Sequence, residues 1–509
     1  MGKSFALRAG LLALVCVPWS GRAAVVVPTT QHADAPGIAW FDGDVPQAFA
    51  AAKKVDEPVF LYWGAKWCPP CQQLKSSVFS RSDFIAKTRQ FVAVYLDGDA
   101  PGAQKWGEVF HVSGYPTVVI LRPDRREITR ISGGVDLSLY ADLLDAALGD
   151  IKPLSEVLAT LRARPAALTA TDCRRLVYYA WETGAVPEKD ERLLAGHLLK
   201  AATVCPGLSP IERARLEVIS ASFAPTPLAV NRVLELLADS GLAPRLADNF
   251  EALGDPFFAA VAARGAAVSA DFVRHWSDAM NAVANDPKVI DADRLVAIGM
   301  QLLVAKQFAD PHEVPATLAT AARARVAAAL AKPMDAYVRA GVVNAASFVD
   351  EQLGDDEANY KMLQSELTTA KTPYYYMVDL GEIEEKRGNL PAAIGWYERA
   401  YRESQGIATR FQWGYTYLAA LLRLEPADHA RIRRVGLEVL GELDGPDRIQ
   451  ARTRRRLETL DARLRAWDTA QHATDDVAAL RARMTTICAK LPALDTGQAA
   501  CRKFLAPQA

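Results

Sequence analysis

Two cysteines separated by two prolines form the clearest candidate reactive site in the sequence. Residues 67–71 read Trp-Cys-Pro-Pro-Cys and lie between an apolar run and a segment typical of a helix. A cysteine at a helix N-terminus has a lowered pKa, because unpaired backbone N–H groups and the helix dipole stabilise its thiolate. We therefore expect Cys68 to attack a substrate sulfur and Cys71, one turn later, to resolve the mixed disulfide.

The neighbours of the pair are expected to tune its redox chemistry. Lys66 adds a positive charge two residues before the first cysteine, and Pro69 and Pro70 stiffen the turn. A zinc half-site and an inert structural disulfide are the alternatives. Zinc would need two further Cys or His ligands at suitable spacing, and the nearest histidines, His32 and His111, form no motif. The sequence therefore predicts no metal site and no cofactor.

The segments around the pair alternate between strand and helix patterns from residue 38 to residue 149. Expected strands cover residues 59–63, 91–96, 117–121 and 127–131, and expected helices cover residues 72–80 and 137–148. Residues 97–99, Asp-Gly-Asp, lack the remaining oxygen ligands of a calcium loop and are expected to form a turn at a strand end. The alternation predicts an α/β domain in which a strand leads directly to the cysteines.

Residues 38–149 resemble a thioredoxin-fold domain, closest to the exported branch that includes the C-terminal domain of the bacterial thiol:disulfide interchange reductase. The residues that carry the resemblance are Trp67, Cys68, Cys71, Phe79, Ser80, Leu96, Asp97, Gly114, Tyr115, Pro116, Thr117 and Gly133. The resemblance implies that Pro116 follows a cis peptide bond and faces the cysteines, and that Trp67, Tyr115 and Pro116 contact the substrate. Many thioredoxins carry a buried Asp where this sequence has Tyr62, so Tyr62 or water would manage the proton, or the reaction would be slower.

After residue 150 the pattern becomes helical, with apolar residues three and four positions apart between Pro or Gly breaks. We expect a helical array over residues 150–371, a tetratricopeptide-like repeat over 372–425 and a C-terminal helical segment over 426–509. The residues that resemble the tetratricopeptide pattern are Leu380, Gly381, Gly388, Ala393, Tyr397 and Ala400. No second clean copy lies about 34 residues away. The predicted fold is therefore a thioredoxin-like α/β domain followed by an all-α, degenerate tetratricopeptide-like solenoid, with an ordinary helical hairpin as the alternative for the repeat.

Charge and length narrow the possible functions. The 509 residues include 59 basic and 60 acidic side chains, a formal net charge of -1, which argues against a role in nucleic-acid binding. Hydrophobic residues make up 50% of the chain, which excludes disorder over most of it. A cluster of arginines over residues 452–456 is expected on the solvated face of a helix, because an apolar stripe follows it.

The N-terminus is typical of a secretory signal peptide over residues 1–23. Lys3 and Arg8 precede an apolar run over residues 9–19, and small residues indicate cleavage after Ala23. Residues 24–37 are then a linker, and the mature chain is expected in the periplasm or outside the cell. No later apolar stretch is long enough to span a bilayer, so no membrane span is expected in the mature chain.

Four further cysteines are expected to form structural disulfides. Cys173 and Cys205 are predicted at the start and the end of a helical hairpin, with a helix from Cys173 to about residue 181 and a turn over residues 184–188. Cys488 and Cys501 flank an expected turn over residues 491–497. Even cysteine numbers in an exported chain favour pairing. A second redox pair that passes electrons to the reactive cysteines is the alternative.

Two hypotheses about function follow. The first is an exported thiol:disulfide oxidoreductase, favoured as a reductase by the family resemblance, that acts on protein disulfides, exchanges with a redox partner protein and docks partners on the helical array. The second is a non-enzymatic binding or scaffold protein whose thioredoxin-like domain is structural. The second requires the cysteine pair to be buried or inert.

Overall fold

A four-stranded mixed sheet forms the centre of an α/β domain in the computed structural model, which describes residues 37–112, 114–132, 140–149, 152–183, 190–492 and 495–506. The strands are β1 (Val59–Gly64), β2 (Val92–Asp97), β3 (Thr117–Leu121) and β4 (Glu127–Ser132). They lie in the order β2-β1-β3-β4, with β1 parallel to β2 and antiparallel to β3, and β3 antiparallel to β4. The four predicted strands are confirmed to within a residue or so at their ends.

Helices cover both faces of this sheet. They are α1 (Val45–Val55), α2 (Pro69–Ser77), α3 (Ser82–Thr88), α4 (Ala103–Val109) and α5 (Tyr140–Gly149). Alternate residues of β1 point to opposite faces, so Phe60 and Tyr62 pack with α2, α3 and α5, whereas Leu61 and Trp63 pack with α1 and α4. The helices α1, α3 and α4 were not among the predicted elements, and two of them have only seven residues. The helix α2 starts three residues before its predicted start.

An all-helical array follows the α/β domain. Its helices are α6 (Leu154–Ala163), α7 (Ala170–Tyr178), α8 (Glu191–Val204), α9 (Pro210–Phe223), α10 (Pro227–Ala238), α11 (Ala247–Phe250), α12 (Asp255–Ala262), α13 (Ala266–Asn285), α14 (Asp291–Gln307), α15 (Ala316–Leu330), α16 (Ala336–Leu353), α17 (Asp356–Glu366), α18 (Tyr374–Lys386), α19 (Leu390–Glu403), α20 (Ile407–Leu424), α21 (His429–Gly441), α22 (Ala451–Gln471), α23 (Thr474–Cys488) and α24 (Gln498–Lys503). Two of them, α9 and α10, begin with a proline after a capping residue, Ser209 and Thr226. The predicted fold class, an α/β domain followed by helical hairpins, is confirmed.

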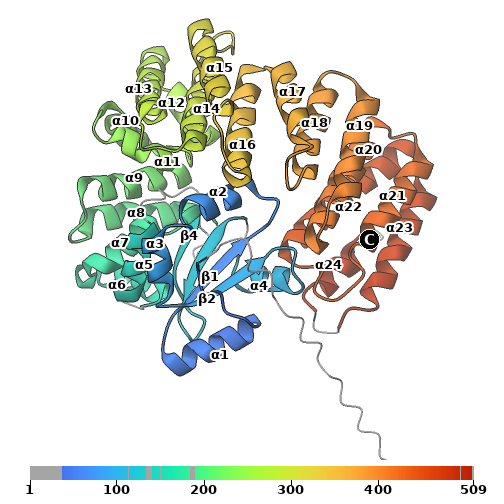
Figure 1. The fold of residues 1–509 in the computed structure, drawn as a ribbon, viewed down its shortest axis with the longest axis horizontal. Coiled ribbons are helices and arrows are strands. Elements are labelled where there is room, and N and C mark those ends of the chain that lie inside the picture. The colour runs from blue at the N-terminus through green and yellow to red at the C-terminus, as the bar shows by residue number, and fades with distance from the viewer. Residues whose placement is uncertain are drawn as a thin grey trace, which may run out of the picture.

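The array curves around the α/β domain and contacts it through several of its helices (Figure 1). Its first helices lie against β4 and α5, α16 packs on α2, and α22 contacts α4. At the first contact the fully buried Arg130 of β4 pairs with Glu127, which also accepts a hydrogen bond from the Tyr179 hydroxyl at 3.0 Å. The same guanidinium donates to the carbonyls of Phe110 and His111. Arg130 therefore joins the array to the segment that precedes Pro116.

The helices α18 and α19 form a closely packed antiparallel hairpin. A Cβ atom added at Gly381 would lie 2.8 Å from the Tyr397 ring, so only glycine allows this approach without a shift. Ala393 and Tyr397 are buried beside it. The glycine, the alanine and the aromatic ring thus allow the two helices to approach closely. The tetratricopeptide resemblance itself stays a prediction.

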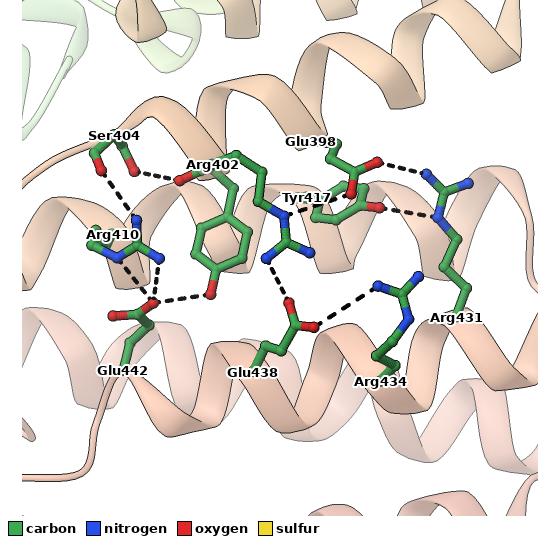
Figure 2. A network of polar contacts seen from close by, with 10 residues as sticks. Glu398, Arg402, Ser404, Arg410, Tyr417, Arg431, Arg434, Glu438 and Glu442 are labelled. Atoms are coloured by element: carbon green, nitrogen blue, oxygen red, sulfur yellow. Dashed lines mark hydrogen bonds and ion pairs between the residues drawn. The ribbon is translucent and has the colours of Figure 1, made fainter.

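A network of ion pairs holds α19, α20 and α21 together (Figure 2). The pairs are Arg410–Glu442 at 2.8 Å, Arg402–Glu438 at 2.7 Å and Arg431–Glu398 at 3.0 Å. Each pair is partly exposed and would contribute little alone, but a network of several pairs in good geometry stabilises more. Arg410 lies in the first turn of α20, so the network positions the end of this helix that faces the α/β domain.

Two disulfides clamp helices within the array. Cys173 of α7 is joined to Cys205 after α8, with their Cα atoms 5.6 Å apart, and Cys488 is joined to Cys501 at 5.7 Å. The expected helix from Cys173 differs from the structure, because α7 already starts at Ala170, capped by Thr169, and ends at Tyr178. The predicted turn over residues 184–188, part of the turn over 491–497, the signal peptide and most of the linker lie outside the described residues. Within the described ranges, no helix combines the length and apolar composition that crossing a bilayer requires.

Candidate active site

The cysteine pair lies where β1 leads into α2. Cys68 is the N-cap residue of α2, and its Sγ accepts a hydrogen bond from the backbone N–H of Cys71 at 3.2 Å. Pro69 and Pro70 occupy the first helical positions, where a missing N–H group costs no hydrogen bond. The two cysteines form a disulfide with their Cα atoms 5.2 Å apart. The structure is thus the oxidised form of a cysteine pair at a helix N-terminus.

Backbone hydrogen bonds hold the segment that carries the pair. The Cys68 N–H donates to the carbonyl of Ala65, and the Gln72 side chain donates to the carbonyl of Lys66 at 2.7 Å. The Lys66 side chain itself is exposed. Burial raises the pKa of Asp97 at the end of β2, and the positive charge of Lys66 opposes that rise. Lys66 therefore acts on a nearby buried carboxyl group, which the sequence analysis did not assign to the site.

The residues predicted to meet the substrate lie beside the cysteines. The Tyr115–Pro116 peptide bond is cis, as the family resemblance implied, and Pro116 is buried. Trp67 and Tyr115 pack against the small cluster that contains both cysteines, and their rings meet edge to face at 5.7 Å. The structure thus brings together residues from the start of α2 and from the loop before β3. Gly133 lies outside the described residues, and His111 is exposed with φ of 52°.

Tyr62 occupies the position where many thioredoxins have a buried Asp. Its side chain is fully buried in the core between α2 and the sheet, 4.8 Å from the Phe79 ring and stacked on Tyr95 at 5.2 Å. Its hydroxyl is beside Gly64 at the end of β1, where an added Cβ atom would lie 2.5 Å away. The hydroxyl is thus directed toward the strand end that leads to the cysteines. A role for Tyr62 in proton transfer stays a prediction.

The array covers the face of the α/β domain that carries the cysteines. Trp67 stacks on Tyr375 of α18 at 6.1 Å and contacts Trp413 of α20 at 6.2 Å. The Arg452 guanidinium of α22 lies over the Tyr115 ring at 4.5 Å. Beneath Trp67 and Tyr115, Cys68 is only 3% exposed and Cys71 is fully buried. The surface that the resemblance assigns to the substrate is therefore occupied by the protein's own helices.

Asp99 is a site residue that the sequence analysis missed. Its carboxylate accepts hydrogen bonds from the backbone N–H groups of Ala408 and Thr409 and from the Thr409 hydroxyl, at 3.0, 2.8 and 2.6 Å. These donors lie at the N-terminus of α20, where a carboxylate is favoured by the helix dipole. Burial raises the pKa of Asp99, and the hydrogen bonds from Thr409 oppose the rise. The turn predicted at residues 97–99 thus also caps a helix 310 positions away, which no local signal reveals.

Glu108 of α4 makes a second contact of this kind, with α22. Its carboxylate pairs with Arg454 at 2.9 Å and accepts from the backbone N–H of Ala451, the first residue of α22, at 3.0 Å. Burial opposes ionisation, but the hydrogen bond and charge of Arg454 lower the pKa of Glu108 overall. The expectation that the arginines over residues 452–456 face solvent is therefore wrong for Arg452 and Arg454. Both contact the α/β domain because α22 packs on α4.

The described residues contain no group of three or more His, Cys, Asp or Glu side chains arranged to hold a metal ion.

A family model described as a thioredoxin-like domain matches residues 45–148. Among solved structures, the chain is similar to one titled DsbH Oxidoreductase, with 17% sequence identity and a TM-score of 0.21, over 25% of this chain and 95% of that chain. No curated protein gives a match. The family match, the mixed sheet and the cysteine pair at the start of α2 identify residues 45–148 as a thioredoxin-like domain.

Proposed function

We propose that the protein is a thiol:disulfide oxidoreductase in which Cys68 is the attacking residue and Cys71 the resolving residue. The observation that carries this proposal is the position of Cys68 as the N-cap of α2, with Cys71 bonded to it and Tyr115 packed beside the pair. A thiolate at this position is stabilised by the helix N-terminus. A pair that needed only structural strength would not require this placement.

In the reducing direction, which the family resemblance favours, the reaction has two exchange steps. The Cys68 thiolate attacks one sulfur of a substrate disulfide, which forms a mixed disulfide and releases the first substrate thiolate. The Cys71 thiolate then attacks the Cys68 sulfur, which releases the second thiolate and leaves the Cys68–Cys71 disulfide seen in the structure. The substrate gains two electrons, and a partner protein that carries a dithiol must return two electrons to the enzyme.

The remaining predictions about the environment belong to the same proposal. Trp67 and Tyr115 contact the substrate, Lys66, Pro69 and Pro70 tune the pair, and the reaction takes place in the periplasm or outside the cell. The helical array selects what reaches the cysteines, through partners that dock on it. Its packing against Trp67 supports a selecting role.

A trapping experiment tests this function directly. The full chain with Cys71→Ala is expressed with its own N-terminus, quenched in acid and analysed for adducts on Cys68 by non-reducing gels and mass spectrometry. Because the resolving thiol is absent, mixed disulfides on Cys68 should accumulate, and they should vanish in a Cys68→Ser, Cys71→Ala double variant. A folded, exported protein without adducts would refute the proposal.

The burial of the pair favours one alternative function, a binding or scaffold protein with a structural disulfide. Cys68 and Cys71 are 3% and 0% exposed, as an inert pair would be. The two functions differ in the reduced state. At neutral pH, a small thiol reagent modifies a reactive Cys68 much faster than a buried structural cysteine. Fast modification would therefore exclude the scaffold function. Modification of Cys68 as slow as that of the cysteines in the two structural disulfides would support it.

A further inference from the structure

The array leaves a cavity beside the cysteine pair while it covers the rest of that face. The cavity has a volume of 500 Å³ and lies between α2 and the helices α16, α17 and α18. Trp67 and Pro69, the residues on either side of Cys68, form part of its wall. Figure 1 shows α16 reaching down to α2, with α17 and α18 next along the arc of helices. The cavity therefore reaches the immediate neighbours of Cys68, the proposed attacking residue.

Two sets of contacts hold the array against the α/β domain around the cysteine pair. On one side, α16 packs on α2, and the Gln73 side chain donates to Asp293 of α14 at 2.7 Å. On the other side, Asp99 and Glu108 cap α20 and α22. A folded protein substrate would have to break one of these sets of contacts to present a disulfide to Cys68. A small molecule needs only the cavity, whose size falls in the range of about 300–1,000 Å³ typical of small-ligand sites.

The charged groups of the cavity wall carry a net positive charge. Two nitrogens of Arg339, Nε and Nη2, donate to the same carboxylate oxygen of Glu366, at 3.1 and 2.5 Å. These two charges therefore compensate each other. Lys371 also lines the cavity, and its ammonium group lies over the Tyr337 ring at 3.8 Å. Among the described residues, Lys371 has no carboxylate partner within ion-pair distance. The cavity thus offers one uncompensated cation to a ligand, together with the aromatic faces of Trp67 and Tyr375.

We propose that the substrate is a low-molecular-weight disulfide that bears carboxylate groups, and that it binds in this cavity with a carboxylate near Lys371. This inference rests on the proposed function and specifies its substrate class. Cys68 attacks one sulfur of the bound disulfide, the first small thiolate leaves, and Cys71 displaces the second from Cys68. The disulfide is reduced to two thiols while the Cys68–Cys71 dithiol is oxidised, and a dithiol donor restores the enzyme.

Three disulfides serve as probes with the full-length reduced protein: glutathione disulfide, which is small and anionic, 2-hydroxyethyl disulfide, which is small and neutral, and insulin, a folded protein. The rate of Cys68–Cys71 oxidation is followed by acid quenching, alkylation and mass spectrometry. We expect glutathione disulfide to react fastest and insulin slowest per disulfide. In Lys371→Gln, the rate with glutathione disulfide should fall about 10-fold or more, because a hydrogen bond to a charged group is lost, while the rate with the neutral disulfide stays unchanged.

The matched control is Lys361→Gln on α17, which also removes a lysine charge. Lys361 lies outside the cavity and pairs with Glu357. The rates of this variant with all three probes should equal those of the wild type. Faster oxidation by insulin than by either small disulfide would overturn the inference, and so would an equal loss with both small disulfides in Lys371→Gln. A reduced protein that reacts with none of the three disulfides would instead refute the oxidoreductase function itself.

Discussion

Removal of the Asp99 carboxylate should loosen the closure of the array over the cysteine pair. Asp99→Ala deletes the acceptor of three hydrogen bonds from Ala408 and Thr409 at the start of α20. Loss of a side chain that caps a helix N-terminus costs about 0.5–2 kcal/mol. Burial already raises the pKa of Asp99, so desolvation offsets part of the gain, and we expect a net loss of about 1–2 kcal/mol. That loss raises the open fraction about 5- to 30-fold.

The open fraction can be measured through the accessibility of Cys68. In a Cys71→Ala background, Cys68 is the one cysteine outside a disulfide among the described residues. A maleimide attached to a large polymer can reach it only when the array opens, whereas N-ethylmaleimide is small enough for the cavity. Asp99→Ala should therefore accelerate modification by the polymer reagent about 5- to 30-fold and change the rate with N-ethylmaleimide much less.

Asp44→Ala provides the matched control for this experiment. Asp44 caps α1 through the backbone N–H of Gln47, and α1 lies on the side of the domain away from the array (Figure 1). The control should lower the free energy of unfolding by a similar amount, measured in urea, and leave the polymer reaction at Cys68 unchanged. Equal polymer rates in the Asp99→Ala and Asp44→Ala proteins would refute the role of Asp99 in closing the array.

Three further predictions concern stability in urea titrations. Glu108→Gln should lower the free energy of unfolding at neutral pH, and the difference from wild type should shrink below pH 4.5. The pKa of Glu108 is lowered in the folded protein, so its stabilising contribution is complete above the ordinary value of 4.5 and is lost as the pH falls through the lowered pKa. A difference that does not depend on pH would contradict this. Gly381→Ala should destabilise the protein by about 1–3 kcal/mol, since its Cβ atom would press on the Tyr397 ring, whereas a gain in stability would show that the hairpin packs more loosely. Replacement of both Cys173 and Cys205 by alanine should lower the free energy of unfolding by roughly 3–4 kcal/mol, because the unfolded chain gains conformational freedom. An unchanged midpoint in urea would contradict a stabilising role of the Cys173–Cys205 disulfide.

The candidate site was largely predictable because its parts are local. The Trp-Cys-Pro-Pro-Cys segment, the apolar strand before it and the helix after it lie within about 20 residues, and their patterns predict an N-terminal thiolate site. Tyr115 and Pro116 were placed by the family resemblance, and the structure shows Tyr115 beside both cysteines. The short helices α3 and α4 were missed, since seven residues carry too little periodicity to separate a helix from a loop.

The closure of that site could not be read from the chain. Asp99 and Thr409 are 310 positions apart, and Glu108 and Arg454 are 346 apart, so their contacts depend on the path of every helix between them. Each of these residues has an ordinary local explanation, a turn for Asp99 and a solvated helix face for Arg454. Spacing within a segment determines which residues share a helix face or a strand end, because that depends on local geometry alone. What covers the face is set by the packing of distant segments, and here that packing places helices of the array over Trp67 and Tyr115 and leaves a charged cavity beside the cysteines.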